Sequence, residues 1–101
     1  MKDMFSSPEA FTAHATIQAG MYMLRRHQLE HDNKWYGRTG IEIAIDQSTG
    51  HDNAILLEYY AGLVVIMDDI IAAKKVIGDD HVQDDKVRSM AQEQINKLNV
   101  S

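Results

Sequence analysis

Apolar residues recur at helical spacing over the first third of the chain. Ser7, Pro8 and Glu9 form a helix-start signal, because serine can cap a first turn, proline fits the first helical position and an acid favours the positive end of the helix dipole. From there to about His31 only Gly20 disfavours a helix, at a cost of about 1 kcal/mol relative to alanine. The pattern therefore predicts an amphipathic helix that ends near residue 31. Its expected buried face consists of Phe11, His14, Ile17, Met21, Leu24 and Leu29.

The strongest helical segment runs from about Asp52 to Ile77. Gly78 follows it in the position of a C-capping glycine. The middle of this segment, residues 59–67, is apolar on every side, and such a helix has to be enclosed on every side in a soluble protein. Because the rest of the chain offers few elements to enclose it, we expect a homodimer that forms through the 54–77 helix.

A shorter helix is predicted at the C-terminal end of the chain. Asp79 and Asp80 are suited to capping its start. Its apolar positions form a narrow stripe that fits packing against one neighbouring helix. The residues of this stripe are Val87, Ala91, Gln94, Ile95 and Leu98.

The middle of the chain, residues 31–53, contains the Asp, Asn and Gly clusters that are typical of loops. Within it, isoleucine occupies every second position of residues 41–46, which fits a half-buried strand or a short helix. The lack of a second strand pattern favours the helix. The expected fold is all-α: a small bundle of three to four helices in a single domain that spans residues 1–101.

Composition narrows the possible functions. The 101 residues include no cysteine, which excludes disulfides, thiolate catalysis and cysteine-based zinc sites. A formal net charge of −5 argues against binding to duplex DNA. The N-terminal residues do not resemble a secretory signal, and the apolar run at residues 59–67 is too short to span a bilayer. We therefore expect a cytoplasmic protein without membrane contact.

Two histidines four residues apart, His27 and His31, are the candidate metal ligands. They lie in the string HQLEH, which matches the H-x-x-E-H motif of inverted zinc peptidases, and Asp32 or His51 could serve as a third donor. Those enzymes are far larger than this chain. Because the pair falls at the expected end of the first helix, two solvated histidines near the negative end of the helix dipole are the favoured interpretation. No metal or other cofactor is predicted.

Basic residues gather between positions 24 and 38, although the chain as a whole is acidic. Trp35 and Tyr36 lie among them in an expected loop. A basic loop with aromatic residues can anchor a partner protein or stack a nucleobase, and Trp35 could alternatively plug the open end of the helix pair. The candidate binding residues are Arg25, Arg26, Lys34, Trp35, Tyr36 and Arg38.

These features favour a non-enzymatic binding protein that acts through a protein partner. In size, charge and lack of catalytic motifs the chain is similar to small acidic inhibitors that phages encode against bacterial defence or host enzymes, a resemblance of class only. Two alternatives remain. One is a module that binds nucleotides or short nucleic acids at the basic loop. The other is a metal-dependent all-α nucleotide hydrolase, whose site would be built across a dimer from Glu42, Asp46, Glu58 or Asp69, although no E-x-x-E motif is present.

Overall fold

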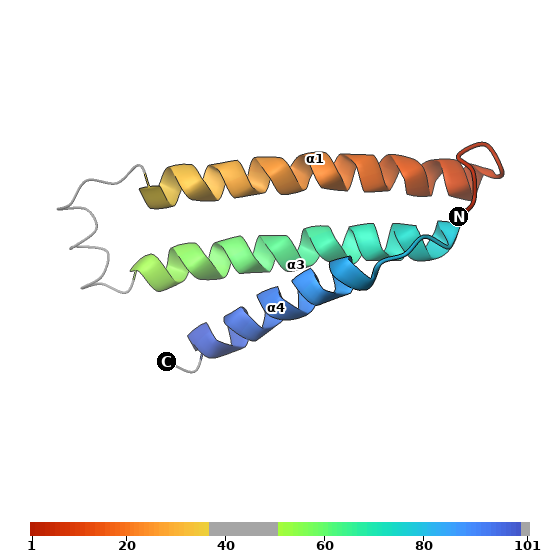
Figure 1. Cartoon of the computed structure of the whole chain (residues 1–101). Helices are drawn as coiled ribbons and strands as arrows, with labels where there is room; N and C mark the ends of the chain where they lie inside the picture. The colour runs from red at the N-terminus through yellow and green to blue at the C-terminus, as the bar shows by residue number, and fades with distance from the viewer. Residues whose placement is uncertain (37–50, 100–101) are drawn as a thin grey trace.

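The computed structural model describes residues 1–36 and 51–99, and among these the side chains of residues 1–33 and 53–99. This part of the chain is all-helical. It forms the three helices α1 (Pro8–Tyr36), α3 (His51–Ile77) and α4 (Val82–Asn99), as Figure 1 shows. α1 and α3 form an antiparallel pair, and α4 turns back to pack on α3. The prediction of a small all-α bundle is confirmed for these residues, and the segment 41–46 lies outside them.

Local capping sets two of the helix ends as predicted. The Ala10 amide donates a hydrogen bond to Ser7 Oγ at 3.0 Å, so Ser7 caps α1. At the end of α3, Gly78 has a positive φ of 73°. There the amides of Gly78 and Asp79 donate to the carbonyls of Lys75 and Lys74 at 3.3 and 2.9 Å, which is the Schellman arrangement.

The first helix is longer than predicted, whereas the second begins within one residue of its predicted start near Asp52. α1 continues through His31 to Tyr36, and α3 begins at His51. The prediction relied on the low helix propensity of Asp and Asn. Packing overrides that propensity here, because the ring of His31 stacks on Tyr59 of α3 with a centroid distance of 4.1 Å.

The face of α1 that packs on α3 contains Ile17 and Leu24 as predicted but otherwise differs from the predicted one. It is lined by small residues and histidines at heptad spacing, and it includes Gly20 where a larger residue was expected. The predicted core residues Phe11, Met21 and Leu29 are instead 51%, 50% and 61% exposed. That part of the prediction is wrong, because helices that approach closely select small side chains. The seam residues of α1 are Ala10, Ala13, Ile17, Gly20, Leu24, His27 and His31.

Two glycines make this close approach possible. A Cβ atom on Gly20 would lie 2.6 Å from Ile70 Cγ1, and a Cβ atom on Gly62 would overlap the ring of His27, whose Nε2 would be only 2.7 Å away. Ile70 and His27 thus fill the spaces that the two glycines leave in the opposite helix. The seam is therefore closed by side chains that enter glycine gaps rather than by large residues that meet each other.

α3 has three faces, and other helices cover two of them. Ala73 and Ile77 pack against α1, and Met67 belongs to the same buried cluster as Ala91 of α4. The third face carries exposed apolar residues, among them Val65 at 62% exposure. One chain therefore encloses α3 on two sides.

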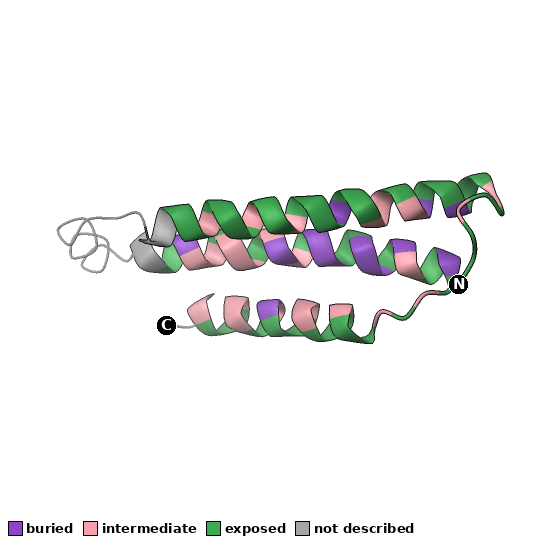
Figure 2. Cartoon of the chain, turned by 45° about the horizontal axis from the view of Figure 1, so that its top comes forward, coloured by how far each residue is buried: buried purple, intermediate pink, exposed green. Residues whose placement is uncertain are grey.

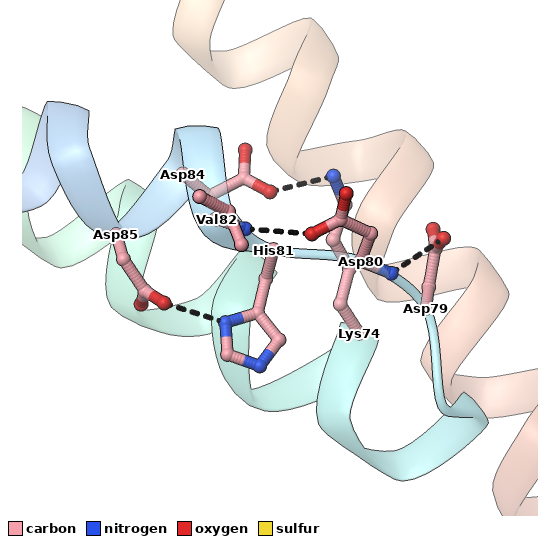
Figure 3. A network of polar contacts seen from close by, with 7 residues as sticks. All are labelled: Lys74, Asp79, Asp80, His81, Val82, Asp84 and Asp85. Atoms are coloured by element: carbon pink, nitrogen blue, oxygen red, sulfur yellow. Dashed lines mark hydrogen bonds and ion pairs between the residues drawn. The ribbon is translucent and has the colours of Figure 1, made fainter.

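Acidic residues hold the turn between α3 and α4, as Figure 3 shows. Asp80 Oδ1 accepts a hydrogen bond from the Val82 amide at 3.0 Å, which confirms the predicted capping role. Lys74 Nζ donates to Asp84 Oδ2 at 2.6 Å and joins the two helices across the turn. Two further contacts lie in this turn. The Asp80 amide donates to Asp79 Oδ1 at 2.8 Å, and His81 Nδ1 lies 2.7 Å from Asp85 Oδ2.

The three helices lie in an open, elongated arrangement. The Cα radius of gyration is 16.9 Å, whereas a compact domain of this length has about 13 Å. α4 contacts α3 but not α1 in the part of the chain that the structure describes. None of the described helices contains an apolar stretch of the length needed to span a bilayer.

The glycine gap at Gly62 yields a prediction whose sign depends on His27. Gly62→Ala should lower the free energy of unfolding, because the steric clash costs about 1–3 kcal/mol and the stacked, hydrogen-bonded His27 ring has little freedom to move. In a His27→Ala background the same change should stabilise the protein by up to about 1 kcal/mol through helix propensity. Urea denaturation of the four proteins measures both effects. Equal effects in the two backgrounds would contradict the packing described.

Candidate functional site

The clearest candidate site is the side of α1 that faces away from α3. Tyr22, Arg25, Arg26 and Leu29 line a shallow hollow of about 420 Å³ there, and we call these four residues the α1 outer face. Tyr22 is 66% exposed and Leu29 is 61% exposed. Figure 2 shows that exposed residues dominate α1, whereas the buried residues concentrate along α3. The outer face thus combines apolar, aromatic and cationic groups in contact with solvent.

A second hollow extends this face toward the seam with α3. It has a volume of about 230 Å³ and shares Tyr22 and Arg26 with the first. Met23, which is 55% exposed, lies between the two shared residues in sequence and contributes to the wall. The complete lining of this second hollow is Tyr22, Met23, Arg26, His27, Glu30 and Ile66.

The two arginines of the outer face differ in their surroundings. Arg26 Nε donates to Glu30 Oε1 at 3.1 Å, and the two side chains are 68% and 54% exposed. An exposed pair of this kind contributes little stability, so a partner can replace it at low cost. Arg25 is exposed and makes no hydrogen bond or ion pair with another described residue. Its guanidinium group is therefore available to a carboxylate or to an aromatic ring of a partner.

The six predicted binding residues fall into three groups according to how much the structure describes of each. Arg25 and Arg26 lie together on the outer face. Trp35 and Tyr36 were expected in a loop, but with Lys34 they are the last three residues of α1, and their side chains lie outside the described residues. Arg38 lies outside the described residues altogether. For all six residues, the predicted binding role stays a prediction.

Sequence reasoning missed Tyr22 and assigned Leu29 to the core. Small residues at heptad spacing, which begin at Ala10 and Ala13 and continue through Gly20, mark the side of α1 that faces α3. This series would have predicted that Tyr22 and Leu29 are exposed. Tyr22 and Leu29, seven residues apart, fall opposite that series on a helical projection. The prediction weighted large apolar residues and therefore chose a face rotated away from the seam.

His27 and His31 are packing residues of the seam. Both rings stack on Tyr59, with centroid distances of 5.1 and 4.1 Å, and His27 Nε2 donates to the Tyr59 carbonyl at 2.7 Å. Tyr60 adds a tilted contact to Tyr59 at 5.2 Å. The interpretation of two solvated histidines at a helix end is thus wrong, because α1 continues beyond them and α3 covers them.

The candidate ligands do not form a metal centre in the described part of one chain. No group of three or more His, Asp or Glu side chains there is arranged to hold a metal ion. The third candidate, Asp32, is exposed, and the side chain of His51 lies outside the described residues. Glu58 and Asp69 line different hollows of α3, and Glu42 and Asp46 lie outside the description.

A larger groove lies on another side of the α1–α3 pair. It has a volume of about 520 Å³ and runs between the first half of α1 and the last half of α3. Its walls are mostly small or apolar residues, together with the two acids Glu9 and Asp69. The lining consists of Pro8, Glu9, Thr12, Ala13, Thr16, Asp69, Ala72, Ala73 and Val76.

Comparison of the chain with protein-family models, curated proteins and solved structures finds no match in any of the three. The chemistry of the residues is therefore what indicates a function. Tyrosine and arginine are the side chains that most often dominate the binding energy of protein interfaces. A face built from Tyr22, Leu29 and two arginines accordingly fits a protein surface that offers an apolar patch and carboxylates.

The α1 outer face should be dispensable for folding. Tyr22→Ala and Leu29→Ala should each change the free energy of unfolding by less than about 0.5 kcal/mol, because both side chains are largely exposed. Leu24→Ala, at the seam, is the matched comparison and should cost more than about 1 kcal/mol. Chemical denaturation followed by circular dichroism measures all three. A large loss of stability in Tyr22→Ala would mean that the folded chain itself uses this face.

Proposed function

We propose that this chain is a non-enzymatic binding protein that contacts a protein partner through the α1 outer face. The observation that carries the proposal is the exposure of Tyr22 and Leu29 beside Arg25, which has no ion pair with another described residue. A soluble helix normally directs such apolar residues inward. Here other residues of α1 form the seam with α3. Packing within the chain therefore does not explain why α1 carries Tyr22 and Leu29.

The energetics of the face suit a binding anchor. Burial of a Tyr or Leu side chain in an interface contributes about 1.5–3 kcal/mol each. Arg25 and Arg26 would add charge-assisted hydrogen bonds to carboxylates of the partner. Tyr36 follows Leu29 by seven residues along the same helix, so a long partner surface could extend to the predicted residues Lys34 and Trp35.

Inhibition of a host or defence complex is the biological role we propose for this binding. Small acidic proteins that phages encode for this purpose are similar to the chain in size and charge, and the resemblance is one of class. Such a protein needs a stable scaffold and one adhesive surface, and no catalytic centre. The predicted cytoplasmic location fits this role.

We also propose that the chain forms a homodimer through the 54–77 helix. The third face of α3 is open to solvent and carries Val65 at 62% and Val76 at 45% exposure. The chain exposes 6742 Å², roughly 1,000 Å² more than the scaling law expects for a compact monomer of this mass. This excess is close to the 800 Å² or so that each partner buries in an interface of standard size.

Partner capture tests the proposed function. The immobilised wild-type chain should retain one abundant protein from a lysate of its host, and the same protein, once purified, should bind with a measurable dissociation constant. Tyr22→Ala should weaken that binding by a factor of about 30 or more, which corresponds to the 2 kcal/mol of an interface anchor. Isothermal titration calorimetry with the purified pair measures the change. Ser89→Ala, at an exposed position of α4, is the control and should bind like the wild type.

Two results would contradict the proposal. One is full binding by a variant that combines Tyr22→Ala and Arg25→Ala. The other is magnesium-dependent hydrolysis of a nucleotide by the wild-type chain that Glu58→Gln abolishes while leaving the fold intact. The second result would establish the nucleotide hydrolase instead.

A further inference from the structure

We propose that the open face of α3 is a self-complementary seam, on which α3 of a second copy lies antiparallel about a two-fold axis. This inference rests on the proposed dimer and specifies which residues meet. The seam, which we call the α3 open stripe, consists of exposed residues at alternating spacings of three and four. Its members are Glu58, Ala61, Val65, Asp68, Ala72 and Lys75.

Space is the first argument for this stripe. α1 and α4 cover the other two faces of α3, so only this face can receive a further helix along its length. Ala61 and Ala72 are small enough to let a second helix approach closely. Ala72 also lines the groove of about 520 Å³ between α3 and α1. A helix that lies on the stripe therefore also covers part of that groove.

Charge complementarity is the second argument, and it selects the direction and the register. In an antiparallel pair centred between Ile66 and Met67, position 58 faces position 75 of the other copy, and position 61 faces position 72. Glu58 is then opposite a lysine and Ala61 is opposite an alanine. Asp68 falls opposite Val65, and its charge is already compensated by Arg88 of its own chain at 3.0 Å. Lys75 is exposed and has no ion pair with another described residue.

The competing arrangements place like charges together or leave Glu58 without a lysine opposite it. In a parallel pair each member of the stripe meets its own copy, so Glu58 would face Glu58 and Lys75 would face Lys75. An antiparallel pair shifted by one heptad toward the start of α3 places Glu58 opposite Asp68, and the opposite shift places Glu58 opposite position 82, beyond the end of α3 at Ile77. Like charges held directly opposite one another destabilise a helix pair. The antiparallel register with Ala61 opposite Ala72 is therefore the one that the residues favour.

Cysteine cross-linking tests the arrangement directly, because the natural chain contains no cysteine. The full-length double variant Ala61→Cys/Ala72→Cys should convert mostly into a reducible covalent dimer under mild oxidation. The two positions of one chain cannot bridge each other, since they lie about 16 Å apart along the helix and a disulfide requires a Cα separation below about 7 Å. Each single variant should stay largely uncross-linked, as should Ala15→Cys on the exposed side of α1.

The outcomes separate this seam from the broader proposals. Efficient cross-linking of either single variant would indicate a parallel pair and overturn the inference. Wild-type dimers in native mass spectrometry without cross-linking of the double variant would overturn the seam but leave dimerisation intact. A monomeric wild-type protein would overturn both the seam and the proposed dimer. It would leave the proposal of partner binding through Tyr22 intact, since calorimetry with the purified partner tests that proposal separately.

A charge at the centre of the stripe provides a second readout that needs no oxidation. Val65→Glu should shift the wild-type dimer to monomer at the same concentration, while Ala15→Glu should leave the dimer unchanged. Light scattering after size-exclusion chromatography gives the masses, and circular dichroism confirms that each variant is folded. A Val65→Glu protein that stays fully dimeric would overturn the inference.

Discussion

The close packing of α1 on α3 is the constraint on which the rest of this structure depends. Ile70 of α3 occupies the space beside Gly20, and His27 of α1 occupies the space beside Gly62, where it also donates a hydrogen bond to the Tyr59 carbonyl at 2.7 Å. Because each helix supplies both a gap and the side chain that fills the other helix's gap, the two can approach closely along most of their length. A side chain of ordinary size at either glycine would separate the helices and open voids along the seam, which protein interiors rarely tolerate.

This constraint explains why large apolar residues of α1 lie on the surface. The seam consists of two alanines, a glycine, the flat rings of two histidines and two larger aliphatic residues, Ile17 and Leu24, and Tyr22 and Leu29 lie outside it. Stability and recognition are thereby separated within one helix: one side holds the fold together, and another side is free to carry binding groups. The acids of the α3–α4 turn serve stability rather than recognition. Lys74 pairs with Asp84, and Asp80 accepts a hydrogen bond from the Val82 amide at the start of α4.

Local features of the fold could be read from the sequence, whereas the orientation of α1 could not. The Ser7 cap and the Gly78 end depend on side chains within a few residues, so their chemistry is visible in the chain itself. The face of α1 depends on the shape of α3, and specifically on the gap at Gly62. Since α1 carries apolar residues on more than one side, hydrophobic periodicity alone favoured Phe11 and Leu29 over a stripe of alanines. The cluster of basic residues in the sequence identified Arg25 and Arg26 of the candidate site. Tyr22 was missed because the side of α1 that faces α3 was predicted incorrectly.

The position of α3 at the centre of the chain also relates the two proposed surfaces to each other. α3 is covered by α1 on one side and by α4 on another, so a second copy can approach only on the third. The α1 outer face lies on the far side of α1 from α3, and dimerisation along α3 would leave it uncovered in both copies. A two-fold dimer of this kind presents two identical binding faces that point away from the seam. Against a partner that is itself oligomeric, the second contact would form at high effective concentration, so that a face of modest size could bind with far greater avidity than one copy alone.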